Sequence, residues 1–253
     1  MATVGLLHPG EMGAALGSAL RGRGHEVLWA STGRSESTSR RADAAGLIDV
    51  GSESVLAERS DVLLSVCPPH AAGEVASKVS DAFGLFVDAN AIAPATARAI
   101  AGARDESKFV DGGIIGPPPR DRGTTRLYLS GAGAAVVAEL FKGTPVDARV
   151  LSADVGDASA LKMTYAAWTK GTVALLLAID GVAETEGVQE ALLEEWRLSL
   201  PELPGALERA ARAATAKGWR WVGEMEEIAA TFSAAGFPDG FHRAAAEIFR
   251  RAR

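Results

Sequence analysis

The sequence predicts an α/β protein, a doubly wound parallel sheet followed by an all-α C-terminal domain, and two observations support this. Up to about residue 150, short apolar runs rich in β-forming residues alternate with longer Ala-rich segments, which is the spacing of βαβ crossovers. From about Asp157 onward the β-rich runs stop and only helical patterns remain. The chain therefore divides into a first domain, residues 1–155, and a helical second domain, residues 156–253.

The strands of the first domain are predicted from short apolar runs without polar alternation, a pattern typical of strands covered on both faces. These runs are residues 3–7, 25–30, 61–66, 85–89, 108–115, 125–131 and 148–152. The amphipathic or Ala-rich segments between them predict helices, namely residues 11–23, 36–46, 70–82, 94–102 and 133–143.

The second domain begins with one predicted helix of about 30 residues, which starts after Gly156 and exceeds the usual length in globular proteins. Such a helix should pack along much of its circumference, in its own domain or against a second subunit. Proline and glycine residues divide the rest into four further predicted helices, namely residues 189–198, 204–217, 219–235 and 239–252.

Composition excludes several classes of function. Hydrophobic residues make up 47% and charged residues 23% of the chain, the balance of a soluble globular protein. The net charge of −6, with no basic run, argues against nucleic-acid binding. Cys67 is the only cysteine, so neither an internal disulfide nor a cysteine-based metal cluster is expected. No secretory signal is evident, and the apolar stretch 171–179 is shorter than the ~20 residues that span a bilayer. We expect a cytoplasmic protein with no metal and no membrane partner.

A glycine-rich turn follows the first predicted strand and opens the first predicted helix, the context that makes a nucleotide-binding pattern credible. Histidine stands where the first glycine of G-x-G-x-x-G would stand. Gly10 would let the backbone approach a pyrophosphate, and Gly13 would let the helix pack close to the sheet. His8 is predicted to be a turn residue, with a contact to phosphate as the alternative. The predicted cofactor-binding turn comprises His8, Pro9, Gly10, Glu11, Met12 and Gly13.

The end of the second predicted strand bears on the choice between NAD and NADP. A carboxylate there would accept from the ribose 2′-hydroxyl of NAD, whereas a 2′-phosphate requires cations and hydroxyl donors. No carboxylate stands at the strand tip, and a guanidinium can hold a phosphate through two hydrogen bonds. An ordinary polar loop is the alternative interpretation, but after the glycine turn we expect NADP(H). The predicted contacts are Ser31, Thr32 and Arg34; Arg40 and Arg41 follow further along the chain.

Five segments, in their order and spacing, resemble the β-hydroxyacid dehydrogenase family, which includes 3-hydroxyisobutyrate and 6-phosphogluconate dehydrogenases. They are GLLHPGEMG (5–13), DVLLSVCPPHAAGEVA (61–76), FVDANAIAPATARAIA (86–101), FVDGGIIGPPP (109–119) and GDASALKMTYAAWTKG (156–171). The resemblance covers the first domain, which it implies to be a Rossmann-type fold, and the first helix of the second. Residues 218–251 resemble the C-terminal domain of a phosphogluconate dehydrogenase-like subgroup.

This resemblance implies roles for individual residues. Cys67 and Pro68 would line the nicotinamide ribose, and Asn90 would lie near the nicotinamide. Lys162 falls six residues after Gly156, where the family keeps its catalytic lysine. Its amine would exchange a proton with the substrate oxygen while hydride passes to or from nicotinamide C4, a role that suits a lysine whose pKa is lowered by partial burial. A surface lysine is the alternative.

The sequence also departs from the family's pattern. The family's substrate loop reads D-A-P-V-S-G-G, and its serine is replaced here by Ile115; the family's asparagine after the lysine is replaced by Ala166. These changes predict a bulkier or less charged substrate. The predicted substrate contacts are Gly112, Gly113, Ile114, Ile115 and Tyr165. Trp219, Trp221 and His242 could also face the substrate, although aromatic residues on helices more often belong to a core.

Three functions remain open from the sequence. The first is an NADP-dependent oxidoreductase acting on a hydroxyl/carbonyl pair, which Lys162 favours. The second is an NADPH-dependent imine reductase, which Ile114, Ile115 and Tyr165 favour. The third is a protein that binds the nucleotide without chemistry. The resemblance also implies a site in a cleft between the domains and a homodimer, for which the long helix would be the interface.

Overall fold

The computed structural model describes residues 1–79 and 84–251. The chain divides into two compact units, Met1–Lys162 and Met163–Arg253, and the division falls inside helix α7 (Asp157–Thr185). The domain boundary predicted after residue 155 lies just before this helix. The first turns of α7, with Lys162, therefore belong to the first unit.

The first unit is built on an eight-stranded sheet with the order β3-β2-β1-β4-β5-β6-β7-β8 among the described residues. Its strands are β1 Thr3–Leu6, β2 Glu26–Trp29, β3 Ile48–Asp49, β4 Val62–Ser65, β5 Leu85–Asp88, β6 Phe109–Ile115, β7 Thr125–Ser130 and β8 Val146–Ser152. Neighbouring strands are parallel except β6 and β7, which are antiparallel. The strand order reverses between β1 and β4, which makes their carboxyl ends the topological switch point of the sheet.

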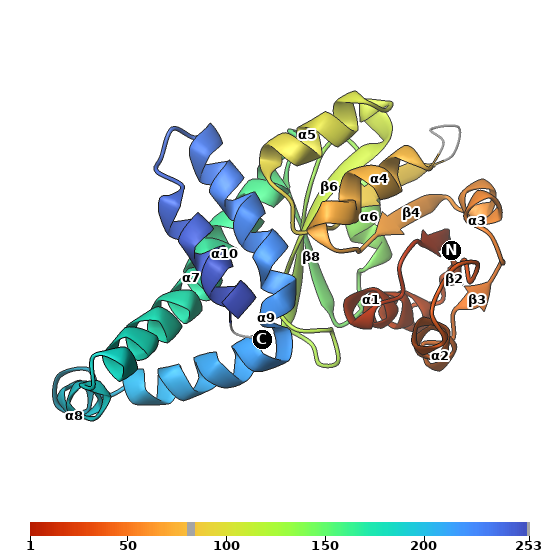
Figure 1. Ribbon diagram of the computed structural model, residues 1–253. Coiled ribbons are helices and arrows are strands. Elements are labelled where there is room, and N and C mark those ends of the chain that lie inside the picture. The colour runs from red at the N-terminus through yellow and green to blue at the C-terminus, as the bar shows by residue number, and fades with distance from the viewer. Residues whose placement is uncertain (80–83, 252–253) are drawn as a thin grey trace. The chain divides into compact units, whose positions relative to one another are not determined.

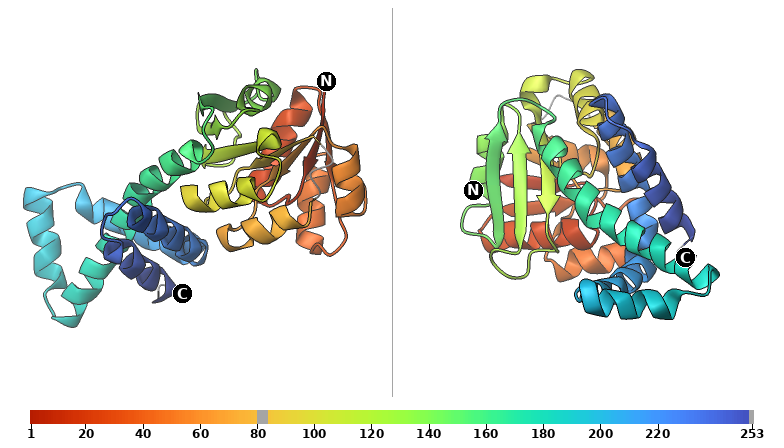
Figure 2. Two further views of the ribbon diagram at one scale, coloured as in Figure 1. Left: turned by 90° about the horizontal axis from the view of Figure 1, so that it is seen from above. Right: turned by 90° about the vertical axis from the view of Figure 1, so that its left-hand side faces the viewer.

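Helices cover both faces of this sheet (Figures 1 and 2). They are α1 Glu11–Gly22, α2 Glu36–Ala44, α3 Glu53–Arg59, α4 Ala72–Ser77, α5 Pro94–Gly102 and α6 Ala134–Leu140, with short 3-10 turns η1 Pro69–Ala71 and η2 Glu106–Lys108. One apolar cluster joins the sheet to α1, α2 and α6, and a second joins it to α3, α4 and α5. Successive residues of β2, such as Val27 and Leu28, enter opposite clusters. The predicted doubly wound α/β class is therefore confirmed.

Some elements of the first unit differ from the prediction. Strand β3 and helix α3 were not expected, because β3 has two exposed residues and α3 is a short polar helix capped by Ser52. The helix predicted over 70–82 is a 3-10 turn followed by α4, which ends at Ser77; residues 80–82 of that prediction lie outside the described residues.

The second unit is all α-helical, as predicted. After α7 come α8 Gln189–Ser199, α9 Leu203–Ala234 and α10 Gly240–Arg251. The prediction of separate helices at 204–217 and 219–235 was wrong, because α9 continues through Gly218. This glycine is buried against Phe249 of α10, and the ring of Phe249 also contacts Trp221 with centroids 5.1 Å apart. Packing against α10 thus offsets the cost of a helical glycine, about 1 kcal/mol relative to alanine.

Helix α7 has 29 residues, and by length and composition it could cross a membrane. The apolar stretch 171–179, which alone was considered from the sequence, is too short to do so. Within the second unit, however, Lys170 of α7 forms an ion pair with Glu224 of α9 at 3.0 Å. Both side chains are mostly buried, at 14% and 11% exposed. This pair shows that the face of α7 that carries Lys170 packs against α9.

Replacing Gly218 with alanine should stabilise the second unit. A Cβ at this position would lie 3.7 Å from a ring carbon of Phe249, an ordinary contact, and its φ lies outside the left-handed region. We expect the free energy of unfolding to rise by about 0.5–1 kcal/mol, because alanine loses less backbone entropy than glycine in a helix. Urea unfolding followed by circular dichroism measures the change.

Gly223→Ala is the matched control, since it lies in the same helix with open space around its Cβ position. A loss of stability in Gly218→Ala, with a gain in Gly223→Ala, would show that the contact with α10 has no room for the methyl group.

Candidate nucleotide-binding and catalytic site

The glycine turn lies at the carboxyl end of β1, at the switch point. Gly10 is the N-cap of α1 and has no side-chain cap, and no atom lies within 4 Å of where its Cβ would stand. The space in front of it is therefore open to a ligand, while the amides of the first helical turn supply donors and a positive dipole end. A Cβ on Gly13 would overlap the carbonyl oxygen of His8, so only glycine fits there. This cradle fits the pyrophosphate of a dinucleotide.

His8 replaces the missing glycine without backbone strain. The Gly10 N–H donates to the His8 carbonyl at 2.9 Å and closes the turn, and no described non-glycine residue has a positive φ. Burial, together with the nearby charges of Arg34 and Lys78, lowers the pKa of His8 to about 4. Its imidazole is therefore neutral near pH 7, and its buried Nδ1 has no hydrogen-bond partner among the described residues.

The loop after β2 is anchored by Arg34. Its guanidinium donates to the Leu7 carbonyl at 3.2 Å and pairs with Glu53 at 2.5 Å, and its side chain is only 19% exposed. Ser31 and Thr32 begin the same loop, and Ser35 caps α2 by accepting from the Thr38 N–H. Arg34 thus lies against the end of β1 rather than projecting freely from the loop.

Arg41 and Asp49 also reach this region, although the sequence analysis assigned neither of them a contact. Arg41 donates from Nε to the Pro9 carbonyl at 3.3 Å and from Nη2 to Thr38 Oγ1 at 3.0 Å, so it joins the glycine turn to the first turn of α2. Asp49 accepts from the Ser31 N–H at 3.1 Å. Burial acts to raise the pKa of Asp49, but hydrogen bonds from Ser31 and Gly51 outweigh it and hold the pKa below its ordinary value.

The loops after β4 and β5 are joined by Asn90, which is 3% exposed. Its Oδ1 accepts from the Cys67 N–H at 2.6 Å, and its Nδ2 donates to Ser65 Oγ at 3.1 Å. Pro68 then caps the 3-10 turn η1. Burial raises the pKa of the Cys67 thiol to about 11, so the sulfur is protonated near pH 7. The predicted residues Cys67 and Asn90 therefore lie together, with Asn90 holding the two loops.

Strand β6 brings the predicted substrate loop against both β5 and α7. A Cβ on Gly112 would lie 3.2 Å from the Ala89 Cβ, next to Asn90. A Cβ on Gly113 would lie 2.6 Å from the Ala158 carbonyl and 3.1 Å from the Lys162 Cβ. The Cβ of Lys162 therefore lies directly over Gly113, and the residue is half-buried.

The remaining predicted residues are placed as follows. Ile114 and Ile115 are buried in β6, at 8% and 4% exposed. Tyr165 and Trp219, in the second unit, are half-exposed or more. Two further aromatic candidates belong to the helical core: Trp221, which packs on Phe249, and His242, which contacts Phe232 with centroids 4.3 Å apart and whose pKa is lowered by burial.

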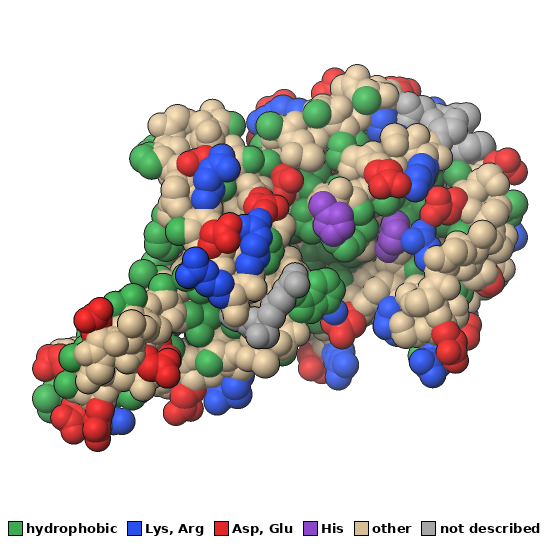
Figure 3. All heavy atoms as spheres, in the orientation of Figure 1, with side chains coloured by type: hydrophobic (Ala, Val, Ile, Leu, Met, Phe, Trp, Pro, Cys, Tyr) green, Lys and Arg blue, Asp and Glu red, His purple; other side chains and the backbone are tan. Residues whose placement is uncertain are grey.

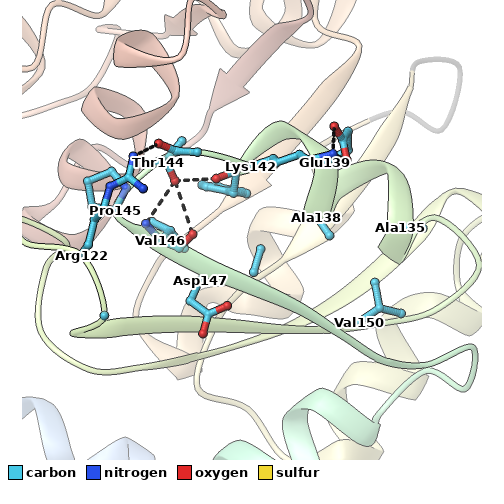
Figure 4. A pocket seen from close by; sticks show the side chains of 14 residues that line it. Arg122, Ala135, Ala138, Glu139, Lys142, Thr144, Pro145, Val146, Asp147 and Val150 are labelled. Atoms are coloured by element: carbon cyan, nitrogen blue, oxygen red, sulfur yellow. Dashed lines mark hydrogen bonds and ion pairs between the residues drawn. The ribbon is translucent and has the colours of Figure 1, made fainter.

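A hollow of about 600 Å³ lies elsewhere in the first unit, between the end of α6, β8 and the loop at Arg122 (Figure 4). Some of its polar groups are bound to one another: Arg122 donates to the Gly143 carbonyl at 2.7 Å, and Thr144 Oγ1 donates to the Phe141 carbonyl at 2.7 Å. No predicted site residue lines it. Over residues 1–79 and 84–251, no group of three His, Cys, Asp or Glu side chains is arranged to hold a metal ion.

Two family models match the chain. Residues 3–91 match the model described as NADP oxidoreductase coenzyme F420-dependent, and residues 183–252 match a domain of unknown function (DUF1932). An uncharacterized 28.5 kDa protein in the 7S RNA 5′ region of Methanothermus fervidus is 34% identical over 193 residues, which cover 76% of this chain and 74% of that protein.

Three solved structures have the same fold as this chain. A conserved protein of unknown function, whose structure is described as similar to 3-hydroxyacid dehydrogenases, is 28% identical with a TM-score of 0.72, over 99% of this chain and 96% of that one. 3-Hydroxyisobutyrate dehydrogenase from Mycobacterium tuberculosis shares the fold, with 16% identity and a TM-score of 0.73 over 99% and 93% of the chains. A reductive aminase from Aspergillus terreus, in complex with NADPH, shares it with 18% identity and a TM-score of 0.63 over 100% and 93%.

The match over residues 3–91 supports an NAD(P)-dependent oxidoreductase that uses a nicotinamide cofactor. The order of the motifs, the doubly wound sheet and the helical second unit all agree with the same assignment. The chain belongs to the β-hydroxyacid dehydrogenase-like family.

Proposed function

We propose that the protein is an NADP(H)-dependent oxidoreductase that transfers hydride between nicotinamide and a hydroxyl/carbonyl substrate, with Lys162 as general acid/base. The observation that carries the proposal is a continuous series of contacts along the carboxyl ends of β4, β5 and β6. Asn90 binds the Cys67 backbone, its neighbour Ala89 packs against Gly112, and the next residue, Gly113, lies under Lys162. These contacts connect the predicted nicotinamide position to Lys162.

Lys162 would supply the proton of the reaction. The bound nicotinamide supplies or accepts the hydride, and the amine of Lys162 would donate a proton to the substrate oxygen during reduction and accept it during oxidation. Gly113 has no side chain, which lets α7 lie against the strand at this position. The substrate oxygen can then be met by an amine held on a rigid helix rather than on a loop.

The cofactor would be held by the glycine turn and by the loop after β2. Gly10 and the first amides of α1 face open space and suit the pyrophosphate. Ser31, Thr32 and Arg34 remain the proposed contacts of the 2′-phosphate. We add Arg41, because it lies between the glycine turn and the first turn of α2.

The negative charge of Asp49 disfavours a 2′-phosphate in this region. Its carboxylate accepts from the Ser31 N–H, at one end of the proposed phosphate site, and its lowered pKa keeps it ionised. Its negative charge would repel the phosphate, whereas the guanidinium of Arg41 would attract it. We propose that the cations outweigh it and that NADP is preferred.

The substrate is proposed to be less charged than a hydroxyisobutyrate or phosphogluconate. Gly112, Gly113, Ile114 and Ile115 offer no hydroxyl to a substrate carboxylate. Tyr165, three residues after Lys162 on α7, would supply a hydroxyl in its place. The same apolar residues favour an NADPH-dependent imine reductase as the second candidate, since a cyclic imine presents no carboxylate.

We further propose a cytoplasmic homodimer, whose interface is a stripe along α7. The stripe consists of residues spaced alternately three and four apart, the period of a coiled-coil seam. These residues are Tyr165, Trp168, Thr172, Leu175, Ile179 and Val182. Trp168 is 74% exposed and Val182 is 62% exposed.

The opposite face of α7 is already covered. It carries Met163, Ala166, Lys170 and Ala174, which are buried or paired within the protein. An apolar hollow of about 370 Å³ between α7 and α8 continues the stripe at Ile179 and Val182. Figure 3 shows hydrophobic side chains reaching the surface along α7, next to acidic side chains over α8. Apolar surface of this kind is typical of an interface between proteins, and the coiled-coil period suits a second copy of the same helix.

Lys162→Ala should lower kcat by about 10²- to 10⁴-fold, the usual contribution of a general acid or base. NADPH affinity, measured by fluorescence titration, should stay within twofold because the nucleotide contacts lie on other strands. Lys142→Ala, a surface lysine paired with Glu139, is the control and should leave turnover unchanged. The substrates are a panel of hydroxyacids, ketones and cyclic imines.

The outcomes separate the three functions. Unchanged ketone reduction in Lys162→Ala contradicts the role of the lysine. Unchanged reduction of a cyclic imine supports the imine reductase instead. A parent protein that binds NADPH but turns over no member of the panel supports a nucleotide-binding protein without chemistry.

Cofactor selectivity tests the 2′-phosphate contacts. Arg41→Ala should weaken NADPH binding by roughly 10- to 100-fold, since a hydrogen bond to a charged group contributes about 1.5–3 kcal/mol, and NADH binding should change little. Asp49→Asn should tighten NADPH binding because it removes a repelling charge. Arg40→Ala, an exposed arginine of the same helix, is the control. Tighter binding of NADH than NADPH by the parent protein would overturn the NADP assignment.

Sedimentation equilibrium tests the dimer. The parent protein should sediment at twice the chain mass of 26.2 kDa. Trp168→Glu and Val182→Glu should shift it to the monomer, because each places a charge in the apolar stripe. Val136→Glu, an exposed valine of α6 in the first unit, should remain a dimer. A parent protein that sediments as a 26.2 kDa particle at micromolar concentration contradicts the proposal.

A further inference from the structure

We propose that Asp111 is a positioning residue for Lys162: its buried carboxylate fixes the first turn of α7 on the sheet and thereby sets where the amine stands. The inference rests on the proposed function, because it assigns Asp111 to the geometry of the proposed acid/base. Asp111 immediately precedes Gly112 and Gly113 in β6.

The Asp111 side chain is fully buried, at 0% exposed. Its Oδ2 accepts from the Gly156 N–H at 3.0 Å, the Ser159 N–H at 2.9 Å and Ser130 Oγ at 3.1 Å. Its Oδ1 accepts from Ser159 Oγ at 2.6 Å. A carboxylate removed from water is costly unless its oxygens are satisfied, and here both oxygens have donors from the start of one helix.

Ser130 completes the cap from the neighbouring strand. Its Oγ donates to Asp111 and accepts from the Ala158 N–H at 3.1 Å. The first amides of a helix have no partner within the helix, and the dipole there favours a negative charge. Two side chains, on β6 and β7, therefore satisfy three backbone amides around the first turn of α7, from positions far away in the sequence.

The same strand meets the same helix again one turn later. Asp111 and Gly113 are two apart in β6 and share one face of the strand. Ser159 and Lys162 are three apart in α7 and share one face of the helix. Asp111 bonds Ser159, and Gly113 lies under Lys162. Because the helix contacts the strand at two successive points, it is restrained from rotating or sliding. The backbone and Cβ of Lys162 are therefore held in one position over β6.

If Asp111 only stabilised the fold, its removal would lower stability and leave the surroundings of Lys162 in the folded protein unchanged. If it positions the helix, its removal changes the surroundings of the amine even in molecules that remain folded. The two roles are therefore distinguished by a measurement on Lys162 itself.

The test compares Asp111→Ala and Asp111→Asn with the parent protein. Asparagine can keep an oxygen at the Oδ2 position and its amide at the Oδ1 position, where the Ser159 hydroxyl can rotate to accept. Asp111→Ala should lower kcat about 100-fold, the effect of misplacing a catalytic group by about 1 Å, with NADPH affinity unchanged. Asp111→Asn should recover much of this loss. Asp157→Ala, which removes another acidic side chain of the first turn of α7, is the matched control.

A second readout does not depend on activity. Competitive acetylation of the lysines, measured by mass spectrometry across pH 6–11, reports the titration and the accessibility of each amine. In Asp111→Ala the profile of Lys162 should shift while that of Lys142 stays unchanged, and hydrogen exchange of residues 156–162 should accelerate. Asp111→Asn should lie between. If Asp111→Ala does not fold, Ser159→Ala, which removes only the bond to Oδ1, should shift the profile in the same direction.

Each outcome decides the proposal. A folded Asp111→Ala with an unchanged Lys162 profile overturns it, whether or not the protein is less stable. A shifted Lys162 profile together with normal turnover in Lys162→Ala keeps the positioning role and refutes the proposed catalytic role. A shifted profile together with loss of turnover in both variants supports both.

Discussion

The start of helix α7 depends on one buried side chain, Asp111, which accepts hydrogen bonds from the first residues of the helix and from the residue before it. Gly156, with φ of 103°, turns the chain between β8 and the helix, and its amide then points to Asp111 at 3.0 Å. Such a conformation suits glycine, and an Arg98 guanidinium lies close to where a Cβ would stand. By accepting from amides at the start of α7, the carboxylate stabilises the first turn of the helix in this register against β6.

A parallel sheet with short connections brings the other elements of the site to the same edge. The loops after β1, β4 and β5 come from separate parts of the sequence, yet each leaves the carboxyl end of its strand. The Asn90 side chain is hydrogen-bonded to the Cys67 backbone and to Ser65. Ala89, the neighbour of Asn90, packs against Gly112 and thereby connects the loop after β5 to β6. Internal side chains thus hold the loops after β4 and β5 in place.

The sequence predicted the elements whose patterns are local and missed those set by distant contacts. The apolar runs predicted seven of the strands, and the glycine turn was recognisable because Gly10 and Gly13 follow a strand and open a helix. Strand β3 is too short to show a pattern, and Gly218 resembles a helix stop unless Phe249 is known to cover it. The bonds of Asp111 to α7 join residues 45 and 48 positions apart, so that no periodicity could reveal them. The catalytic role of Lys162 was predicted from the family resemblance and stays a prediction.

Helix α7 combines two constraints that act on different parts of its length. Its first turn is fixed by Asp111 and Gly113, and its later turns carry one face buried in the second unit and one apolar stripe on the outside. The stripe begins at Tyr165, three residues after Lys162, so a second copy bound along it would stiffen the same helix that carries the amine. A rigid helix transmits orientation along its axis because each peptide is bonded to the next turn. In the proposed dimer, the interface residues and Lys162 would therefore belong to one continuous helix.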